Sequence, residues 1–387
     1  MSNVTYRRVE PGWISDAEGV PQPTTTCTKL DTRRMPIKCI CARFLVSRDQ
    51  QSPARLERRA RPPDPKARRQ RQRQRPPPPP PPPAVARNST EEMHHKARNT
   101  TRAHLRELHR RVQASQLQSF SESEATDLGI DCVELPLRPD GLLPEETDEA
   151  VYFHPWPLRR LEAHPVDMTD PTTRESARVK EKLWARFDRK GTDQDGFLSA
   201  VLADEFLEYL REGPLGRDTL EQFSLWTEGT FEGGIIRSRY MDFSASADPD
   251  TGPGAPHAAD LKFEEAWCAR KGHPHVSLIV THKVAPEEKL LRTEVLALVG
   301  IMRTRLSRAA LKEHTIIPIN MISCMRQRQA RILQAHFDGE DLVIRKSHLY
   351  DFTTRELREK NIPLFLLYMA SRPIGDTKAY KKRIREV

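Results

Sequence analysis

Residues 329–352, QARILQAHFDGEDLVIRKSHLYDF, decide the fold of the C-terminal part of this 387-residue chain. The stretch consists of two apolar-rich runs joined by Asp338-Gly339, and an Asp-Gly pair between such runs is a strong signal for a β-hairpin. The acidic residues at the turn need no catalytic explanation, because turn geometry alone favours Asp there. We therefore interpret the stretch as a hairpin that sets the register of a sheet.

This hairpin lies within a longer series of predicted elements. The sequence predicts a strand over 275–284, a helix opened by Pro286, a strand over 315–323 and, after the hairpin, a helix over 354–369. The order strand, helix, strand, strand, strand, helix predicts an α+β domain with a mostly antiparallel sheet. Upstream of this series, helices are predicted over 172–187, 200–210, 218–226 and 261–268.

Composition and pattern divide the chain into six segments. With 32 prolines and only 6% aromatic residues, we expect one main folded region preceded by a long disordered N-terminal arm. The predicted order is a poorly ordered segment (1–54), an Arg/Gln-rich and polyproline linker (55–90), a surface-lying or frayed helix (91–118), a loop-rich extension (119–171), the α+β domain (172–376) and a basic tail (377–387).

The positive charge of the chain is concentrated in the arm. Residues 55–75 contain ten basic and two acidic residues, so +8 of the net +9 lies there and the remainder carries only +1. Charge alone allows this tract to bind RNA, DNA or an acidic partner, and it also resembles a nuclear import signal. The residues that would make such contacts are Arg68, Arg69, Arg71, Arg73 and Arg75.

The run from Pro76 through Pro83 predicts a polyproline II helix. Such a helix can dock in an aromatic groove of a protein partner, and it can equally serve as a spacer. No apolar run approaches the ~20 residues that span a bilayer, and the six cysteines are scattered rather than framework-like. We expect a reduced protein of the cytoplasm or nucleus with no membrane association.

The segment from His314 through Asp376 carries a family resemblance. The residues that carry it are His314, Pro318, ARILQAHFDG at 330–339, LVIRK at 342–346, LYDF at 349–352 and PIGD at 373–376. In these blocks the chain resembles a family of uncharacterised proteins from filamentous ascomycete fungi. The resemblance implies a lineage and a fold unit, and it implies no activity.

The predicted order of elements also raises the alternative of a nuclease. Helix, three strands, helix is the core order of the PD-(D/E)xK fold, whose chemistry needs an acidic residue two positions before a lysine to hold a divalent metal. Here Ile344 stands two positions before Lys346. An active or degenerate nuclease stays open only if candidate residues converge in one cleft; these are Glu294, His314, His336, Arg345 and Lys346.

No metal or cofactor site is predicted. The stretch 188–196 hints at an EF-hand, but Gly191 and Leu202 stand where the loop needs oxygen ligands. Cys39 and Cys41 have no second cysteine pair at zinc spacing. The leading hypothesis is a non-enzymatic interaction protein, with the nuclease and charge-driven RNA or DNA binding through residues 55–75 as alternatives.

Overall fold

The computed structural model describes residues 84–140, 150–163, 165, 168–190, 197–211, 224–231, 234–241, 261–270 and 272–378 of the chain. The predicted N-terminal segment, the arginine tract, the polyproline run and the loop at 191–196 lie outside these residues. So does most of the predicted basic tail.

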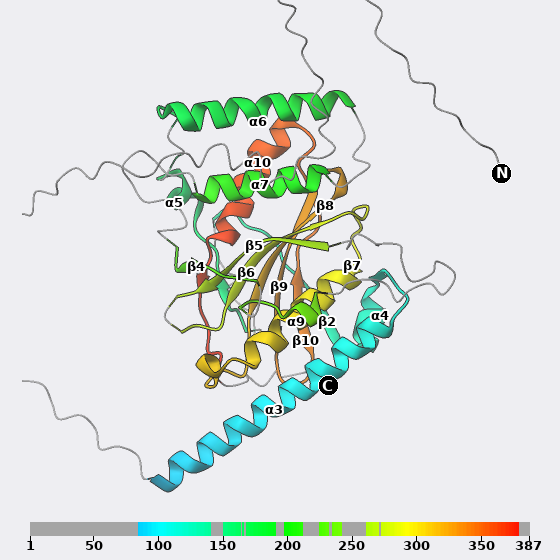
Figure 1. The fold of residues 1–387 in the computed structure, drawn as a ribbon, viewed down its shortest axis with the longest axis vertical. Coiled ribbons are helices and arrows are strands. Elements are labelled where there is room, and N and C mark those ends of the chain that lie inside the picture. Colours follow the sequence, from blue (N-terminus) through cyan, green and yellow to red (C-terminus); the bar gives the residue numbers. More distant parts are fainter. Residues whose placement is uncertain are drawn as a thin grey trace, which may run out of the picture. The chain divides into compact units, whose positions relative to one another are not determined.

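An eight-stranded sheet forms the middle layer of the described fold (Figure 1). Its strand order is β2, β10, β9, β8, β6, β5, β4, and β11 also pairs with β9. The bounds are β2 Ile130–Glu134, β4 Trp226–Glu228, β5 Leu261–Ala269, β6 Val276–His282, β8 Ile319–Met325, β9 Gln329–Phe337, β10 Leu342–Lys346 and β11 Tyr350–Asp351.

The α+β class is confirmed, but the sheet is mixed rather than mostly antiparallel. Strands β6 and β8 run parallel, because helix α9 (Arg292–Leu306) crosses between them and returns the chain in the same direction. Strands β2 and β10 are also parallel. The other pairs, including the β9–β10 hairpin, are antiparallel.

The predicted hairpin forms as expected. Phe337 pairs with Leu342, which leaves four residues in the turn. The Asp338 carboxylate accepts the backbone N–H groups of Glu340 and Asp341, each at 2.9 Å, and Gly339 takes a φ of 112°. The acidic turn is thus closed by its own hydrogen bonds.

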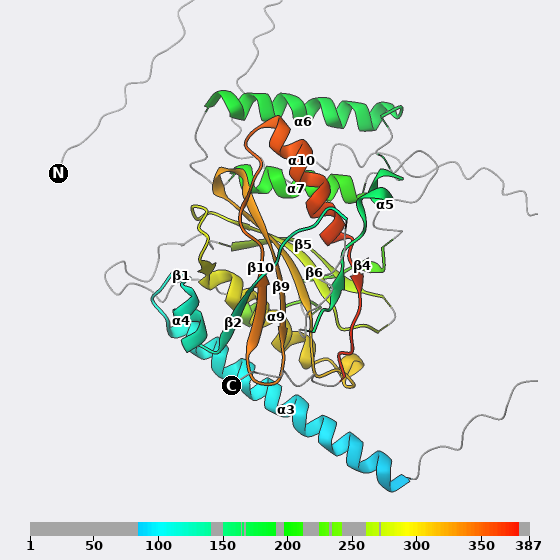
Figure 2. The ribbon, with the colours of Figure 1, turned by 180° about the vertical axis from the view of Figure 1, so that it is seen from behind.

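Helices cover both faces of the sheet (Figures 1 and 2). Helices α3 (Ala84–Ala114) and α9 lie on one face, and α7 (Phe197–Arg211) and α10 (Arg355–Met369) lie on the other with α6 (Pro171–Lys190). Strand β8 serves both cores, because Ile319 and Met321 join the α9 side while Ile322 and Cys324 join the α7 side. This alternation is what a strand buried on both faces requires. None of the described helices has the length and apolar character to cross a membrane.

The described residues of segment 119–171 are part of the fold rather than an extension outside it. It contains α4 (Glu122–Asp127), α5 (Leu158–Glu162), β1 (Ser119–Phe120) and β3 (Phe153–His154) in addition to β2. Strands β1 and β3 pair with the short strands β7 (Leu290–Leu291) and β12 (Arg372–Pro373). Because β2 is an edge of the central sheet, a domain boundary at residue 172 would remove a strand.

One predicted helix is a strand in the structure. Residues 261–268, expected to be helical, lie in β5, where pairing with β6 overrides the helix-favouring Glu and Ala residues. A bulge between Phe263 and Glu265 interrupts the alternation of buried and exposed positions, which hid the strand from pattern reading. The helix expected over 218–226 lies mostly outside the described residues, and of its last three residues Trp226 begins β4.

Helix α9 starts later than Pro286, because Leu290 and Leu291 first pair with β1. Glu294, in the first turn of the helix, accepts the N–H of Leu291 at 2.9 Å. It thereby satisfies one of the free N–H groups at the helix start.

Helices α3 and α9 are antiparallel, and each closes the C-terminal end of the other with an arginine. The buried Arg98 of α3 donates to the carbonyl of Leu306 at the end of α9 and to the carbonyls of Leu311 (2.7 Å) and His314 in the segment that follows. The buried Arg292 of α9 donates to the carbonyls of Val112 (3.1 Å) and Gln113 (3.0 Å) at the end of α3. A cation at this end offsets both the unpaired carbonyls and the helix dipole.

The helix predicted over 91–118 is therefore packed rather than frayed. Its apolar stripe, Leu105, Leu108 and Val112, is buried in the same core as α9.

Candidate functional site

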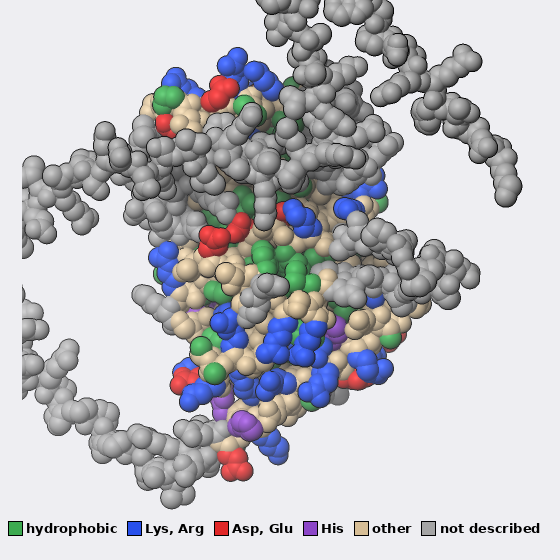
Figure 3. Space-filling model, in the orientation of Figure 1, with side chains coloured by type: hydrophobic (Ala, Val, Ile, Leu, Met, Phe, Trp, Pro, Cys, Tyr) green, Lys and Arg blue, Asp and Glu red, His purple; other side chains and the backbone are tan. Residues whose placement is uncertain are grey.

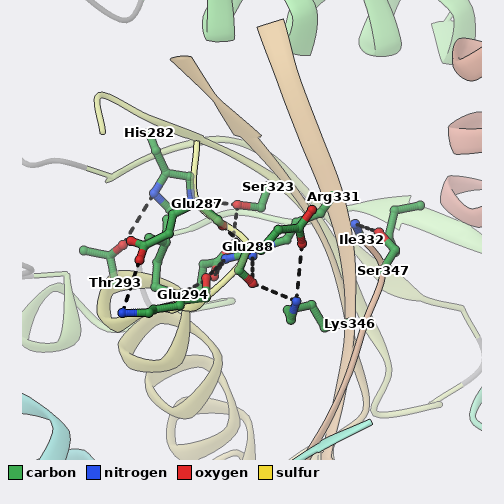
Figure 4. A network of polar contacts seen from close by, with 12 residues as sticks. His282, Glu287, Glu288, Thr293, Glu294, Ser323, Arg331, Ile332, Lys346 and Ser347 are labelled. Atoms are coloured by element: carbon green, nitrogen blue, oxygen red, sulfur yellow. Dashed lines mark hydrogen bonds and ion pairs between the residues drawn. The ribbon is translucent and has the colours of Figure 1, made fainter. Parts of the chain in front are cut away.

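The arrangement that most resembles a catalytic centre is a buried polar network on the α9 side of the sheet (Figure 4). Glu294 and Arg331 form an ion pair at 2.5 Å, and both side chains are fully buried. The Glu294 carboxylate also accepts the hydroxyl of Ser323 at 2.7 Å, and that hydroxyl lies 2.9 Å from Nε2 of His282. Four elements, α9, β9, β8 and β6, each contribute one residue.

A serine, a histidine and an acid in contact invite comparison with a hydrolase triad, and the geometry excludes it. In a triad the acid orients the imidazole and the imidazole contacts the serine. Here Glu294 contacts Ser323 directly, and the other imidazole nitrogen of His282 faces the hydroxyl of Thr293 at 3.4 Å. No atom of the network is open to a substrate, since these side chains are buried.

The charges in this network are compensated. Burial on its own would raise the pKa of Glu294, but the charge and hydrogen bonds of Arg331, with His282 and Ser323, lower it. Arg331 also donates to the carbonyls of Glu287 and Glu288, at 3.0 and 3.1 Å. Burial lowers the pKa of His282 to about 4, so its imidazole is neutral at neutral pH. The network holds β9 to the segment before α9.

The candidate residues predicted from the sequence do not meet in one cleft. Glu294 is fully buried and paired with Arg331. Lys346 reaches only the outer side of this region, where its ammonium donates to the carbonyl of Glu288 at 2.7 Å.

The other three candidates lie elsewhere. His336 and Arg345 are on the opposite face of the sheet from α9, and the ring of His336 lies tilted against that of Tyr152, with ring centroids 4.7 Å apart. His314 lies near the C-terminal end of α9, with Nδ1 2.7 Å from the hydroxyl of Thr377. This dispersal removes the geometric basis for a nuclease centre at these residues.

A different set of residues converges on the surface where α3 and α9 lie. We call Arg102 and Arg106 of α3, Arg239 of the 3-10 turn at Ser238–Tyr240, and Arg303 of α9 the arginine cluster. Arg102, Arg106 and Arg239 are exposed and Arg303 is half-buried. Figure 3 shows Lys and Arg side chains gathered over this part of the molecule.

The positive charges of the arginine cluster act on one another. The pKa of Arg303 is lowered, mainly by burial and then by the positive charges of Arg239 and Arg106. The guanidinium groups of Arg303 and Arg239 lie 4.4 and 4.8 Å from the ring centre of the buried Tyr240. No acidic residue in the described part of the chain forms an ion pair with any of the four arginines.

The arginine cluster continues into a pocket of about 640 Å³ between α3 and the end of α9. Arg102 belongs to both. The remaining side chains with ionisable groups in the lining are His94, His95, Arg98, Arg308, Lys312, Glu313 and Lys378. The Glu313 carboxylate forms an ion pair with the Lys378 ammonium at 2.8 Å, so the net charge of the lining is positive.

Sequence reasoning missed the arginine cluster because its members come from distant elements. The only local signal was the recurrence of arginine at Arg98, Arg102, Arg106 and Arg110, four residues apart along a predicted helix. Such a row lies along one side of a helix and drifts slowly around it. Its first member is accordingly buried against α9, and the later ones are exposed.

Within the described residues, no group of three or more His, Cys, Asp or Glu side chains is placed to hold a metal ion. No family model, no curated protein and no solved structure matches this chain. The resemblance of residues 314–376 to a fungal family stays a prediction.

Proposed function

We propose that this protein is a non-enzymatic nucleic-acid-binding protein and that the arginine cluster is its contact surface. The observation that supports this is the convergence of four arginines from three elements without an acidic partner among the described residues. Like charges held together repel, and a polyanion relieves that repulsion while releasing its own counterions.

The chemistry of the surface favours the phosphate backbone over the bases. Tyr240 is buried behind Arg239 and Arg303, so it offers no exposed ring on which a base could stack. Arginines one helical turn apart, about 6 Å, are suited to successive backbone phosphates. We therefore expect binding that is strongly salt-dependent and weakly sequence-dependent.

The test compares two sets of substitutions in the full chain. In the domain variant, the four arginines of the arginine cluster become Gln. In the arm variant, Gln replaces Arg68, Arg69, Arg71, Arg73 and Arg75. Fluorescence anisotropy with a labelled DNA duplex and a labelled RNA hairpin, measured over a range of salt, gives the affinity and its salt slope.

We expect the domain variant to bind more weakly and to lose about 3 to 4 units of the slope of log K against log salt for duplex DNA, since each phosphate contact contributes about 0.9. A matched control replaces four exposed arginines remote from α3, namely Arg174, Arg178, Arg355 and Arg372. If the control and domain variants lose equal affinity, net charge alone explains binding. If only the arm variant loses it, the contact surface is residues 55–75 instead.

The non-enzymatic part of the proposal has its own readout. Because the candidate catalytic residues are dispersed or sealed, we expect labelled DNA and RNA to stay intact with the protein in Mg²⁺ or Mn²⁺. Cleavage that persists in Glu294→Gln would point to another centre, and cleavage abolished by that variant would restore the nuclease interpretation.

A further inference from the structure

A cysteine and a buried arginine meet on the α9 side of the sheet. Nη1 of Arg305, in the last turn of α9, donates to Sγ of Cys268 on β5 at 3.2 Å. Cys268 packs against the core on the α9 side but is only half-buried. Gly229, just after β4, passes close to the sulfur without a side chain to cover it, since a Cβ there would lie 3.4 Å from Sγ. The pair therefore joins a partly accessible thiol to a cation.

The guanidinium of Arg305 has few other partners. Arg305 is only 6% exposed, and its buried Nε has no hydrogen-bond partner. No acidic residue in the described part of the chain forms an ion pair with it. Burial lowers the pKa of Arg305, and the nearby sulfur of Cys268 opposes that shift. A buried cation without an anion is unfavourable, so the site favours negative charge at the position of the sulfur.

The usual reason for an arginine at the end of a helix does not account for this contact. The carbonyl of Leu306, at the end of α9, accepts from Arg98 of α3. Arg305 donates instead across to β5. The helix dipole favours a cation at this end of α9, but it supplies no partner for the N–H groups of the guanidinium.

The guanidinium also distinguishes Cys268 from the other cysteines in the described part of the chain. Cys324 is buried, and burial raises the pKa of its thiol well above the ordinary value. Cys132 is half-buried, as Cys268 is, and burial raises the pKa of its thiol too. Cys132 therefore offers a comparison of similar exposure without an arginine hydrogen-bonded to the sulfur.

We propose that Cys268 is a modification site at which hydroperoxides oxidise the sulfur and Arg305 pairs with the resulting sulfinate. In the first step the Cys268 thiolate attacks one peroxide oxygen, the O–O bond breaks, and the leaving hydroxide takes up the proton lost by the thiol to give water. The sulfur, oxidised to a sulfenic acid, loses its proton and attacks a second peroxide in the same way. The sulfinate that forms carries the anion that the buried guanidinium lacks. The inference does not depend on nucleic-acid binding.

Treatment of the full chain with hydrogen peroxide, followed by blocking of the remaining thiols and peptide mass spectrometry, tests the proposal. We expect sulfinate to accumulate at Cys268 about tenfold faster than at Cys132. Both rates come from the wild-type protein, so the comparison does not require a variant to fold. Equal rates at the two cysteines, or a Cys268 peptide that stays unmodified, would overturn the proposal.

Two variants show whether Arg305 is responsible. Arg305→Met keeps an unbranched side chain without the charge, and its Cys268 should be oxidised at about the same rate as Cys132. Arg237→Gln removes an exposed positive charge whose backbone lies against Thr304 of α9, and its Cys268 should react as in the wild type. A folded Arg305→Met protein whose Cys268 reacts as fast as in the wild type would contradict the role of Arg305.

The pairing in the oxidised protein has a separate readout. Peroxide treatment should raise the midpoint temperature of unfolding of the wild type by about 2 °C or more, because the sulfinate supplies Arg305 with an anion. The variant Cys268→Ser, treated in the same way, corrects for oxidation elsewhere in the chain. A midpoint that falls on oxidation of Cys268 would show that the sulfinate does not pair with Arg305.

Discussion

The buried network around Glu294 and the exposed arginine cluster differ in how their charges are balanced. In the buried network, the guanidinium of Arg331 donates hydrogen bonds to the Glu294 carboxylate and to backbone carbonyls. On the α3 surface, Arg106, Arg239 and Arg303 lie close enough to repel one another. Burial demands compensation of charge within the chain, whereas solvent tolerates a local excess that an external polyanion can then use.

The largest expected effect comes from breaking the buried pair. Arg331→Met leaves the Glu294 carboxylate buried without its cation, which should reduce the free energy of unfolding by about 3–5 kcal/mol. Chemical denaturation followed by circular dichroism measures the loss. The double variant Arg331→Met with Glu294→Gln removes the charge as well and should recover a large part of the stability. A single variant as stable as the wild type would show that the pair is not what holds β9 to α9.

A second effect of similar size depends on pH. His282 has a pKa of about 4 in the folded protein, below its ordinary value of 6.5, so the unfolded chain takes up a proton first as pH falls. The stabilising contribution is complete above pH 6.5 and is lost as pH drops towards 4, amounting to about 3 kcal/mol. Denaturation at a series of pH values checks this, with His282→Gln as the comparison. The pKa values of His109 and His275 are also lowered, so the quantity to compare is the difference in the free energy of unfolding between His282→Gln and the wild type at each pH. If that difference stayed constant over the pH series, His282 would not be the source of the pH dependence.

The smallest effect on stability is expected at the arginine cluster. Replacing the exposed Arg106 and Arg239 with Gln removes repulsion rather than attraction, so the free energy of unfolding should stay within about 0.5 kcal/mol of the wild type or rise slightly. The measurement is denaturation at low and high salt, since salt screens the repulsion that the variant removes. A marked loss of stability would mean that these arginines serve the fold, and the contrast with Arg331 would fail.

The fold was predictable where the signal is local. The hairpin at Asp338-Gly339, helix α10 and the strands β6 and β8 stand in the sequence as apolar runs with turn or cap residues beside them. Strand β2 gave no such signal, because only its first residue, Ile130, is buried and its partner β10 lies far along the chain. Strand β5 was mistaken for a helix because its bulge breaks the alternation.

The candidate sites were less predictable for a related reason. Glu294 was identified as a charged residue on a helix, but nothing in the sequence showed that Arg331 would neutralise it. Arg106 and Arg303 come together only through the packing of α3 on α9. A net charge near zero outside the arm also concealed this local excess of positive charge.

The paired arginine caps of α3 and α9 cannot form during translation until α9 has been synthesised. Arg292 follows the end of α3 by roughly 180 residues, which at about 5–20 residues per second is a delay of roughly 10 to 40 s. Through that delay the C-terminal carbonyls of α3 lack their cap, and Leu105, Leu108 and Val112 lack α9. The nascent chain therefore presents a basic helix with an open apolar stripe, the kind of segment that chaperones bind and that aggregates when it is left uncovered.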